Sequence, residues 1–217
     1  MQPSPYISTR IAALWTISLC SALLFVLLSS WVIAGGELQI NPWLQEFQAP
    51  MWTLGARLLT FIGSKGPIIV IALWVVWYLY AAAGRNGEIK LFLLVLLGSE
   101  AWNVVLKLLF HRVRPDVNRL IEITGYSYPS GHSMAAFSLY GVLCYLLWSR
   151  WSGWKGRLVL LAASSLMILG IGMSRVYLGV HYPSDVAGAY AASLSWLLFC
   201  IGFYEYKWLE RSPAKAS

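Results

Sequence analysis

Charged residues are scarce in this chain, and acidic ones are scarcer still. Only 12% of the 217 residues are charged, with nine Asp and Glu against 16 Lys and Arg, while 59% are hydrophobic and the mean hydropathy is +0.64. This balance excludes an ordinary soluble domain and predicts a protein of the lipid bilayer. The net charge of +7 then fits topology signals and anion binding, so we expect no nucleic-acid partner.

Cysteine and clustered carboxylates are also lacking. The three cysteines, Cys20, Cys144 and Cys200, lie in separate apolar runs, and neither their number nor their spacing fits a disulfide framework or a zinc site. No group of carboxylates predicts bound magnesium or calcium. We therefore expect neither a metal nor another cofactor, and the composition leaves the oligomeric state open.

Long apolar runs are what the chain has in abundance. A helix needs about 20 apolar residues to cross a bilayer, because the hydrocarbon is about 30 Å thick. Six segments approach that length: residues 11–34, 67–83, 91–110, 133–148, 158–173 and 183–204. The first could be a signal peptide, but its apolar run exceeds the usual length of about 7 to 15 residues, and no A-x-A site precedes Gly35.

The segment between the first two runs, residues 35–66, mixes prolines and basic residues with tryptophan and leucine, which favours short helices at the membrane interface. No internal repeat or long linker divides the chain. The predicted fold class is all-α: one membrane-embedded domain over residues 1–217, a bundle of six transmembrane helices with interfacial helices between spans one and two.

The basic residues between the spans predict the orientation. With both termini cytoplasmic, nine of the 16 basic residues face the cytoplasm, as the positive-inside rule requires: Arg10, Arg85, Lys90, Arg150, Lys155, Arg157, Lys207, Arg211 and Lys215. In this orientation Lys107 ends span three, His132 opens span four, Arg175 ends span five and Asp185 opens span six, all on the outer side. Four span ends should therefore converge on one extracytoplasmic site.

Three cations belong to this predicted site. Lys107 and Arg114 form the pattern K-x6-R-P with Pro115, and Arg175 follows an apolar run. Taken singly, Lys107 could be a lysine that snorkels to the interface, and Arg114 could be an ordinary loop charge. Together they could neutralise a phosphoryl group, and a planar guanidinium offers two parallel hydrogen bonds to its oxygens. This predicts a metal-independent reaction.

The pattern P-S-G-H stands at the entrance of span four, from Pro129 to His132. Ser130 is a typical N-cap residue and would suit a structural helix equally well. A helix start also exposes backbone N–H groups that favour an anion, and Gly131 would let a phosphate approach closely. His132 could protonate a leaving oxygen near neutral pH.

His181 and Asp185 suggest a nucleophile and the group that orients it. An imidazole that attacks phosphorus needs one free nitrogen, so the other nitrogen should donate to an acceptor such as Asp185. Asp185 could instead be an ordinary first-turn acid, because Pro183 is well placed to start a helix. The contact between His181 and Asp185 is therefore a prediction that coordinates can test.

These motifs together resemble the signature of the type 2 phosphatidic acid phosphatase superfamily, K-x6-R-P, P-S-G-H and S-R-x5-H-x3-D. Every position matches: Lys107, Arg114, Pro115, Pro129, Ser130, Gly131, His132, Ser174, Arg175, His181 and Asp185. The resemblance implies that His181 forms a phosphohistidine, Asp185 supports it and His132 protonates the departing group. It also implies five phosphate-binding residues: Lys107, Arg114, Ser130, Gly131 and Arg175.

The resemblance further implies a lipid phosphatase of the bacterial cytoplasmic membrane. Its substrates would be phosphatidylglycerophosphate, undecaprenyl pyrophosphate, phosphatidic acid or diacylglycerol pyrophosphate, among which the sequence does not choose. A lipid phosphotransferase would use the same residues and stays an alternative. A transporter is disfavoured, because these charges gather at span ends rather than at the midplane. Outside the signature, Glu100 is expected to contact a basic residue or another span, and Trp102, Tyr126 and Tyr128 are expected to be interface anchors.

Overall fold

The chain folds entirely into helices in the parts that the structure describes. This computed structural model covers residues 5–36, 49–83, 85–116, 119–151 and 153–211. The helices are α1 (Pro5–Ile33), α3 (Pro50–Ile62), α4 (Lys65–Ala83), α5 (Asn86–Phe110), α6 (Gly131–Trp148), α7 (Trp154–Tyr177) and α8 (Pro183–Arg211). The all-α prediction is confirmed for these residues.

Several of these helices are long and apolar enough to cross a membrane. Four qualify individually, namely α1, α5, α7 and α8, and the pair formed by α3 and α4 raises the number to five if it is counted as one broken span. The remaining helix, α6, does not qualify by the same standard: it has 18 residues, and its first turn begins with Gly131 and the polar His132. The protein is therefore a membrane protein, but the count of six spans is not confirmed.

Helix α3 corresponds to part of the segment that was predicted to contain short helices. It has 13 residues, packs against α7, and meets α4 at an angle of 49°. Its apolar side chains Trp52, Leu58 and Phe61 are exposed, whereas Ala56 is buried. A short amphipathic helix is thus present. The rest of that prediction, residues 37–48, lies outside the described residues.

The centre of the bundle is a core shared by α5, α6 and α8. Its fully buried members are Phe92, Val95, Leu139, Val142 and Cys200. The outward faces of the helices expose large apolar side chains, as expected where they contact lipid tails rather than water. Because lipid is as apolar as leucine, close packing and interhelical hydrogen bonds must hold the helices together.

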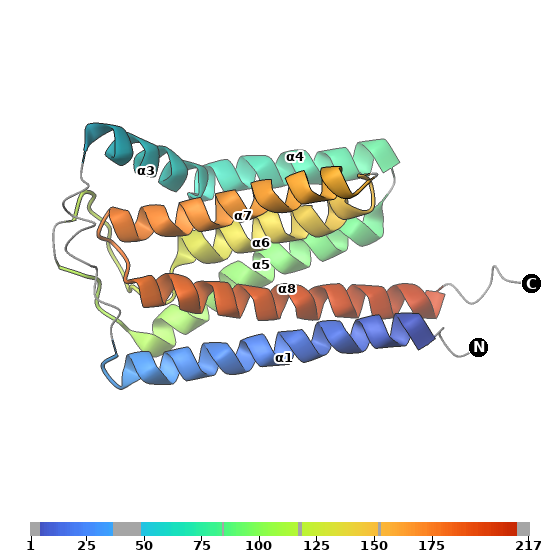
Figure 1. The fold of residues 1–217 in the computed structure, drawn as a ribbon, viewed down its shortest axis with the longest axis horizontal. Coiled ribbons are helices and arrows are strands. Elements are labelled where there is room, and N and C mark those ends of the chain that lie inside the picture. Colours follow the sequence, from blue (N-terminus) through green and yellow to red (C-terminus); the bar gives the residue numbers. More distant parts are fainter. Residues whose placement is uncertain (1–4, 37–48, 84, 117–118, 152, 212–217) are drawn as a thin grey trace, which may run out of the picture.

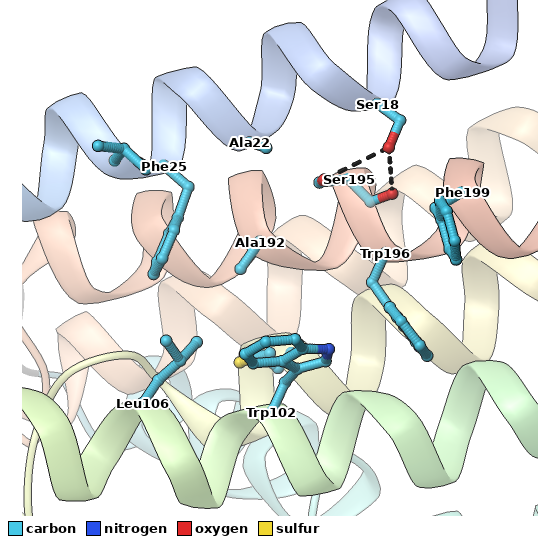
Figure 2. Close-up of a pocket in the computed structure, with 11 residues that line it drawn as sticks. Ser18, Ala22, Phe25, Trp102, Leu106, Ala192, Ser195, Trp196 and Phe199 are labelled. Carbon is cyan, nitrogen blue, oxygen red and sulfur yellow. Dashed lines mark hydrogen bonds between the residues drawn. The ribbon is translucent and has the colours of Figure 1, made fainter.

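Serine hydroxyls supply such hydrogen bonds between α1 and α8. Ser18 Oγ donates to the Ser195 carbonyl oxygen at 2.8 Å, and Ser21 Oγ donates to that of Ala191 at 2.9 Å. Figure 2 shows the first contact at one end of an apolar pocket between α1, α5 and α8, whose floor includes Trp102. None of the predicted site residues lines this pocket, so the predicted phosphate site lies elsewhere.

The ends of the helices place the motifs together. Helix α1 begins and α8 ends at one end of the bundle, whereas the ends of α5 and α7 and the starts of α6 and α8 lie at the other end (Figure 1). The described connecting residues 111–116, 119–130 and 178–182 cross that second end. The predicted convergence of four span ends is therefore present in the fold.

Candidate active site

The segment after α5 places two arginines in the site. Helix α5 stops because His111 adopts a left-handed conformation with φ 45°, which histidine tolerates better than most residues. The chain continues without helical structure, and Arg112 and Arg114 are two residues apart with the exposed Val113 between them. In an extended segment, residues two apart share a face, so both guanidinium groups can turn towards the bundle.

The predicted contact between His181 and Asp185 is present. His181 Nδ1 lies 3.2 Å from Asp185 Oδ2, and the two side chains are 2% and 0% exposed. Asp185 is in the first turn of α8, and His181 precedes this helix in a short connection from α7. The carboxylate oxygen that meets the imidazole also accepts from the Tyr182 backbone N–H at 2.9 Å. Asp185 therefore orients the ring as well as favouring the helix dipole.

Arg114 meets the other side of the same imidazole. Its Nη1 lies 3.1 Å from His181 Nε2 and 2.9 Å from the Val180 carbonyl oxygen. A guanidinium can only donate, so Nε2 must be the nitrogen with the lone pair, and Nδ1 must carry the hydrogen that faces Asp185. This is the tautomer that a nucleophilic Nε2 requires.

Burial has a large effect on His181. It lowers the pKa of this imidazole to about 4, and the opposing contribution of Asp185 does not restore the usual value. We therefore predict that this imidazole stays neutral well below pH 6.5. Because protonation would remove the lone pair, kcat/KM should fall only as the pH drops towards 4. The test is to measure this pH profile with a lipid monophosphate and with a lipid pyrophosphate. A fall in kcat/KM that is caused by an enzyme group occurs at the same pH with both substrates. A common fall near pH 6.5 would contradict the prediction.

Arg175 lies in the last turn of α7 and is 1% exposed. Its Nη1 donates to Thr60 Oγ1 of α3 at 3.1 Å, and Thr60 in turn contacts Ser174 Oγ at 2.9 Å. The buried Nε has no hydrogen-bond partner within the described part of the chain. A buried N–H without an acceptor is costly and calls for an explanation. An anionic oxygen bound in the site would supply the acceptor.

Two further predicted members, His132 and Lys107, lie in the same electrostatic environment. His132 interacts with the charges of Arg114, Arg175 and Lys107, and with His181. Lys107 Nζ also donates to the Tyr126 carbonyl oxygen at 2.6 Å. A phosphate group placed among these cations would stabilise the protonated form of His132, which is the form that a general acid needs.

The P-S-G-H motif is placed as predicted, but Ser130 acts differently. It occupies the N-cap position of α6, yet its side chain makes no capping hydrogen bond and instead accepts from Ser133 Oγ at 2.9 Å. The prediction of a side-chain cap was therefore wrong. The Ser130 backbone N–H donates to the Asp185 carbonyl oxygen at 3.1 Å, which ties this motif to the start of α8. A Cβ at Gly131 would lie 3.0 Å from Asn103 Oδ1, so only glycine fits without displacement.

Three residues of the site were missed by sequence reasoning. Arg112 Nη1 lies 2.6 Å from Asp185 Oδ1, Ser127 Oγ donates to Asp185 Oδ2 and lies 3.3 Å from His181 Nδ1, and Thr60 holds Arg175. Arg112 is a variable position within K-x6-R-P. Ser127 and Thr60 lie outside all three motifs, and nothing in their spacing distinguishes them from other hydroxyl residues.

The expectations for Tyr128 and Glu100 have different outcomes. Tyr128 is completely buried rather than an interface anchor: its ring packs against Phe25 and Phe110, and its hydroxyl lies 2.9 Å from Ser29 Oγ. It thereby fixes the segment that leads into P-S-G-H. Glu100 forms an ion pair with Lys65 of α4 at 2.7 Å, which confirms a contact with a basic residue on another helix.

Most of the polar side chains of the site are positively charged or are hydrogen-bond donors. Over the described ranges, no three side chains of His, Cys, Asp or Glu are grouped so that they could hold a metal ion. The three cysteines are free, as expected. Guanidinium, ammonium and imidazole groups around a buried, unsatisfied N–H suit an oxyanion with several acceptor oxygens.

Comparison with known proteins agrees with this chemistry. The chain is 34% identical over 167 residues to phosphatidylglycerophosphatase B of Bacillus subtilis, covering 76% of this chain and 77% of that protein. It is 30% identical over 186 residues to an undecaprenyl-diphosphatase of Sulfolobus acidocaldarius, covering 82% and 85%. The crystal structure of a transmembrane PAP2-type phosphatidylglycerolphosphate phosphatase from Bacillus subtilis superimposes with a TM-score of 0.75 at 28% identity, over 87% of this chain and 96% of that one.

The sequence model of the PAP2 superfamily, the type 2 phosphatidic acid phosphatases, matches residues 88–209. This range contains all three motifs and runs from α5 to α8. The match covers more than half of the chain, and it agrees with the relatives in sequence and in structure. The chain therefore belongs to the PAP2 superfamily of lipid phosphatases.

Proposed function

We propose that the protein hydrolyses a phosphomonoester or pyrophosphate bond of a membrane lipid through a phosphohistidine at His181. The observation that carries this proposal is the state of the imidazole: Asp185 holds Nδ1, and Nε2 keeps its lone pair beside Arg114. A nucleophile whose orienting group is already in place needs little reorganisation before attack.

In the first step, Nε2 of His181 attacks phosphorus, a nitrogen–phosphorus bond forms, and the bond to the leaving oxygen breaks. His132 gives its proton to that oxygen. Lys107, Arg114 and Arg175 hold the three equatorial oxygens, together with the Ser130 hydroxyl and the Gly131 backbone N–H. In the second step, water attacks phosphorus, His132 takes a proton from it, and the nitrogen–phosphorus bond breaks to release inorganic phosphate.

The reaction is proposed to be independent of metal ions. In phosphoryl transfer, divalent cations commonly neutralise the charge of the equatorial oxygens. Here three basic side chains are proposed to neutralise that charge instead. The buried Nε of Arg175 supports this proposal, because a phosphoryl oxygen would supply the acceptor that this N–H lacks among the residues that the structure describes. A guanidinium keeps its charge at all physiological pH values.

The substrate is proposed to be a lipid, because the site lies at the ends of apolar helices where acyl or prenyl chains can stay in the bilayer. The named relatives support phosphatidylglycerophosphate and undecaprenyl pyrophosphate as candidates, and phosphatidic acid and diacylglycerol pyrophosphate share the same chemistry. We further propose a single six-span domain in the bacterial cytoplasmic membrane, with both termini cytoplasmic and the site extracytoplasmic. The start of α1 and the end of α8 lie at the opposite end of the bundle from the site, which supports placing the termini and the site on opposite sides of the membrane (Figure 1).

The test is to measure phosphate release from a panel of purified lipid phosphates in detergent, with and without EDTA. We expect turnover of at least one lipid phosphate, with less than a twofold change on chelation and release of free phosphate. A second experiment follows the labelled phosphoryl group in the presence of another lipid. Transfer to that lipid instead of water would favour the phosphotransferase, and loss of activity with EDTA would contradict metal independence.

A further inference from the structure

The buried carboxylate of Asp185 has both of its oxygens occupied. Oδ2 lies 3.2 Å from His181 Nδ1 and accepts from the Tyr182 backbone N–H and from Ser127 Oγ. Oδ1 accepts from Arg112 Nη1 at 2.6 Å. The carboxylate is completely buried and the Arg112 side chain is 11% exposed, so little water screens this ion pair.

Arg112 also contacts the two residues on either side of Pro183. Its Nη1 donates to Ser184 Oγ at 2.8 Å, and its guanidinium carbon lies 4.2 Å from the centre of the Tyr182 ring. One side chain from the segment after α5 thus touches three of the four residues that open α8. The planar guanidinium suits this task, because it can donate in several fixed directions and stack on an aromatic ring at the same time.

Arg112, in the variable part of K-x6-R-P, and Arg114, its fixed arginine, lie on opposite sides of the pair formed by His181 and Asp185. Arg114 meets the Nε2 side of the imidazole, and Arg112 meets the far oxygen of the carboxylate. They therefore have different chemistry within the proposed function: Arg114 can bind a phosphoryl oxygen at the reacting nitrogen, whereas Arg112 lies behind the carboxylate.

We propose that Arg112 is a positioning residue that acts on His181 through Asp185. This inference rests on the proposed function. Arg112 holds the carboxylate in its ionised form and in one orientation, so that Oδ2 accepts from Nδ1 and keeps the lone pair on Nε2. Removal of the guanidinium leaves a buried carboxylate without its counterion. The carboxyl group can then take up a proton or rotate, and the imidazole loses the acceptor that selects its tautomer.

The experiment compares Arg112→Met, which mimics only the aliphatic part of the side chain, with Arg112→Lys, which keeps the charge. We expect Arg112→Met to lower kcat on the order of 10²-fold with KM changed less than threefold, because loss of the tautomer impairs the chemical step rather than binding. Arg112→Lys should recover only about tenfold of that loss, because an ammonium group keeps the charge but lacks the fixed donor directions of the guanidinium. The matched control is Arg10→Ala, which breaks an ion pair with Glu205 remote from the site and should keep kcat within twofold.

Two results would overturn the inference: a kcat for Arg112→Met within threefold of the unaltered protein, or a loss in Arg112→Lys as large as in Arg112→Met. If Arg112→Met does not fold, Arg112→Lys is the deciding variant. Its kcat should be about tenfold lower than that of the unaltered protein, with an unchanged Tm. An unchanged kcat, or an effect on KM alone, would contradict the proposal. Failure of the proposed function is recognised separately, because the unaltered protein would then release no phosphate or His181→Ala would remain active.

Discussion

Replacing His181 by alanine is expected to lower kcat on the order of 10⁵-fold, as removal of a covalent nucleophile does in other enzymes. The imidazole is buried, Asp185 holds its Nδ1, and Arg114 faces the Nε2 lone pair that is proposed to attack phosphorus. The other histidine of the site, His132, is the proposed acid, so we expect it not to replace the nucleophile. The measurement is phosphate release from a lipid phosphate under saturating conditions.

The matched control is the third histidine of the chain. His111 is exposed, ends α5 and contacts the Tyr126 ring. His111→Asn keeps a residue that tolerates positive φ, and kcat should stay within twofold. Turnover of His181→Ala comparable to that of the control would show that the nucleophile has been assigned to the wrong residue.

Replacing Arg175 by alanine is expected to lower kcat/KM on the order of 10³-fold, the scale found when a cation that stabilises a phosphoryl transition state is removed. The same variant should bind inorganic phosphate more weakly, measured as a raised inhibition constant. The physical reason is that the buried Nε lacks an acceptor among the described residues, and a phosphoryl oxygen would provide one. Arg175→Lys should recover only part of the loss, because an ammonium group lacks the planar fork.

Folding defects are separated from this effect by the Tm and by a second arginine on the same helix. Arg157 lies 18 residues before Arg175 in α7, about 27 Å away at 1.5 Å per residue, and packs near Trp148. Arg157→Ala should keep kcat/KM within twofold. The Tm of Arg175→Ala should be no lower than that of the unaltered protein, since the substitution removes a buried charge. Undiminished phosphate inhibition in Arg175→Ala would contradict the assignment.

The helical architecture could be predicted from the sequence because apolar runs of membrane-spanning length leave few alternatives. The ends of the helices were less accurate. Helix α7 begins four residues before the predicted start at 158 and ends four residues after 173, since Ser174 and Arg175 continue the last turn. A polar residue need not end a membrane helix when it faces the interior of the bundle.

The participating motifs could also be predicted, since orientation alone brings four span ends to one side. The contacts among them could not. Ser127 and Thr60 act through single hydroxyl groups whose value depends on the position of Asp185 and Arg175 in three dimensions. Nothing in the sequence singles out Arg112, because spacing does not reveal which carboxylate a guanidinium meets. Tyr128 looked like an interface anchor for a similar reason: an aromatic ring suits both a membrane boundary and a packed interior.

The central claim is that the phosphoryl group passes through a covalent bond to His181, and one measurement tests it most directly. The protein is mixed with a lipid phosphate carrying a radioactive phosphorus atom, quenched in base within milliseconds, digested and mapped by mass spectrometry. The account predicts a base-stable, acid-labile label on the peptide that contains His181 during turnover. Label on a different residue, or full turnover with no labelled peptide at any quench time, would contradict it.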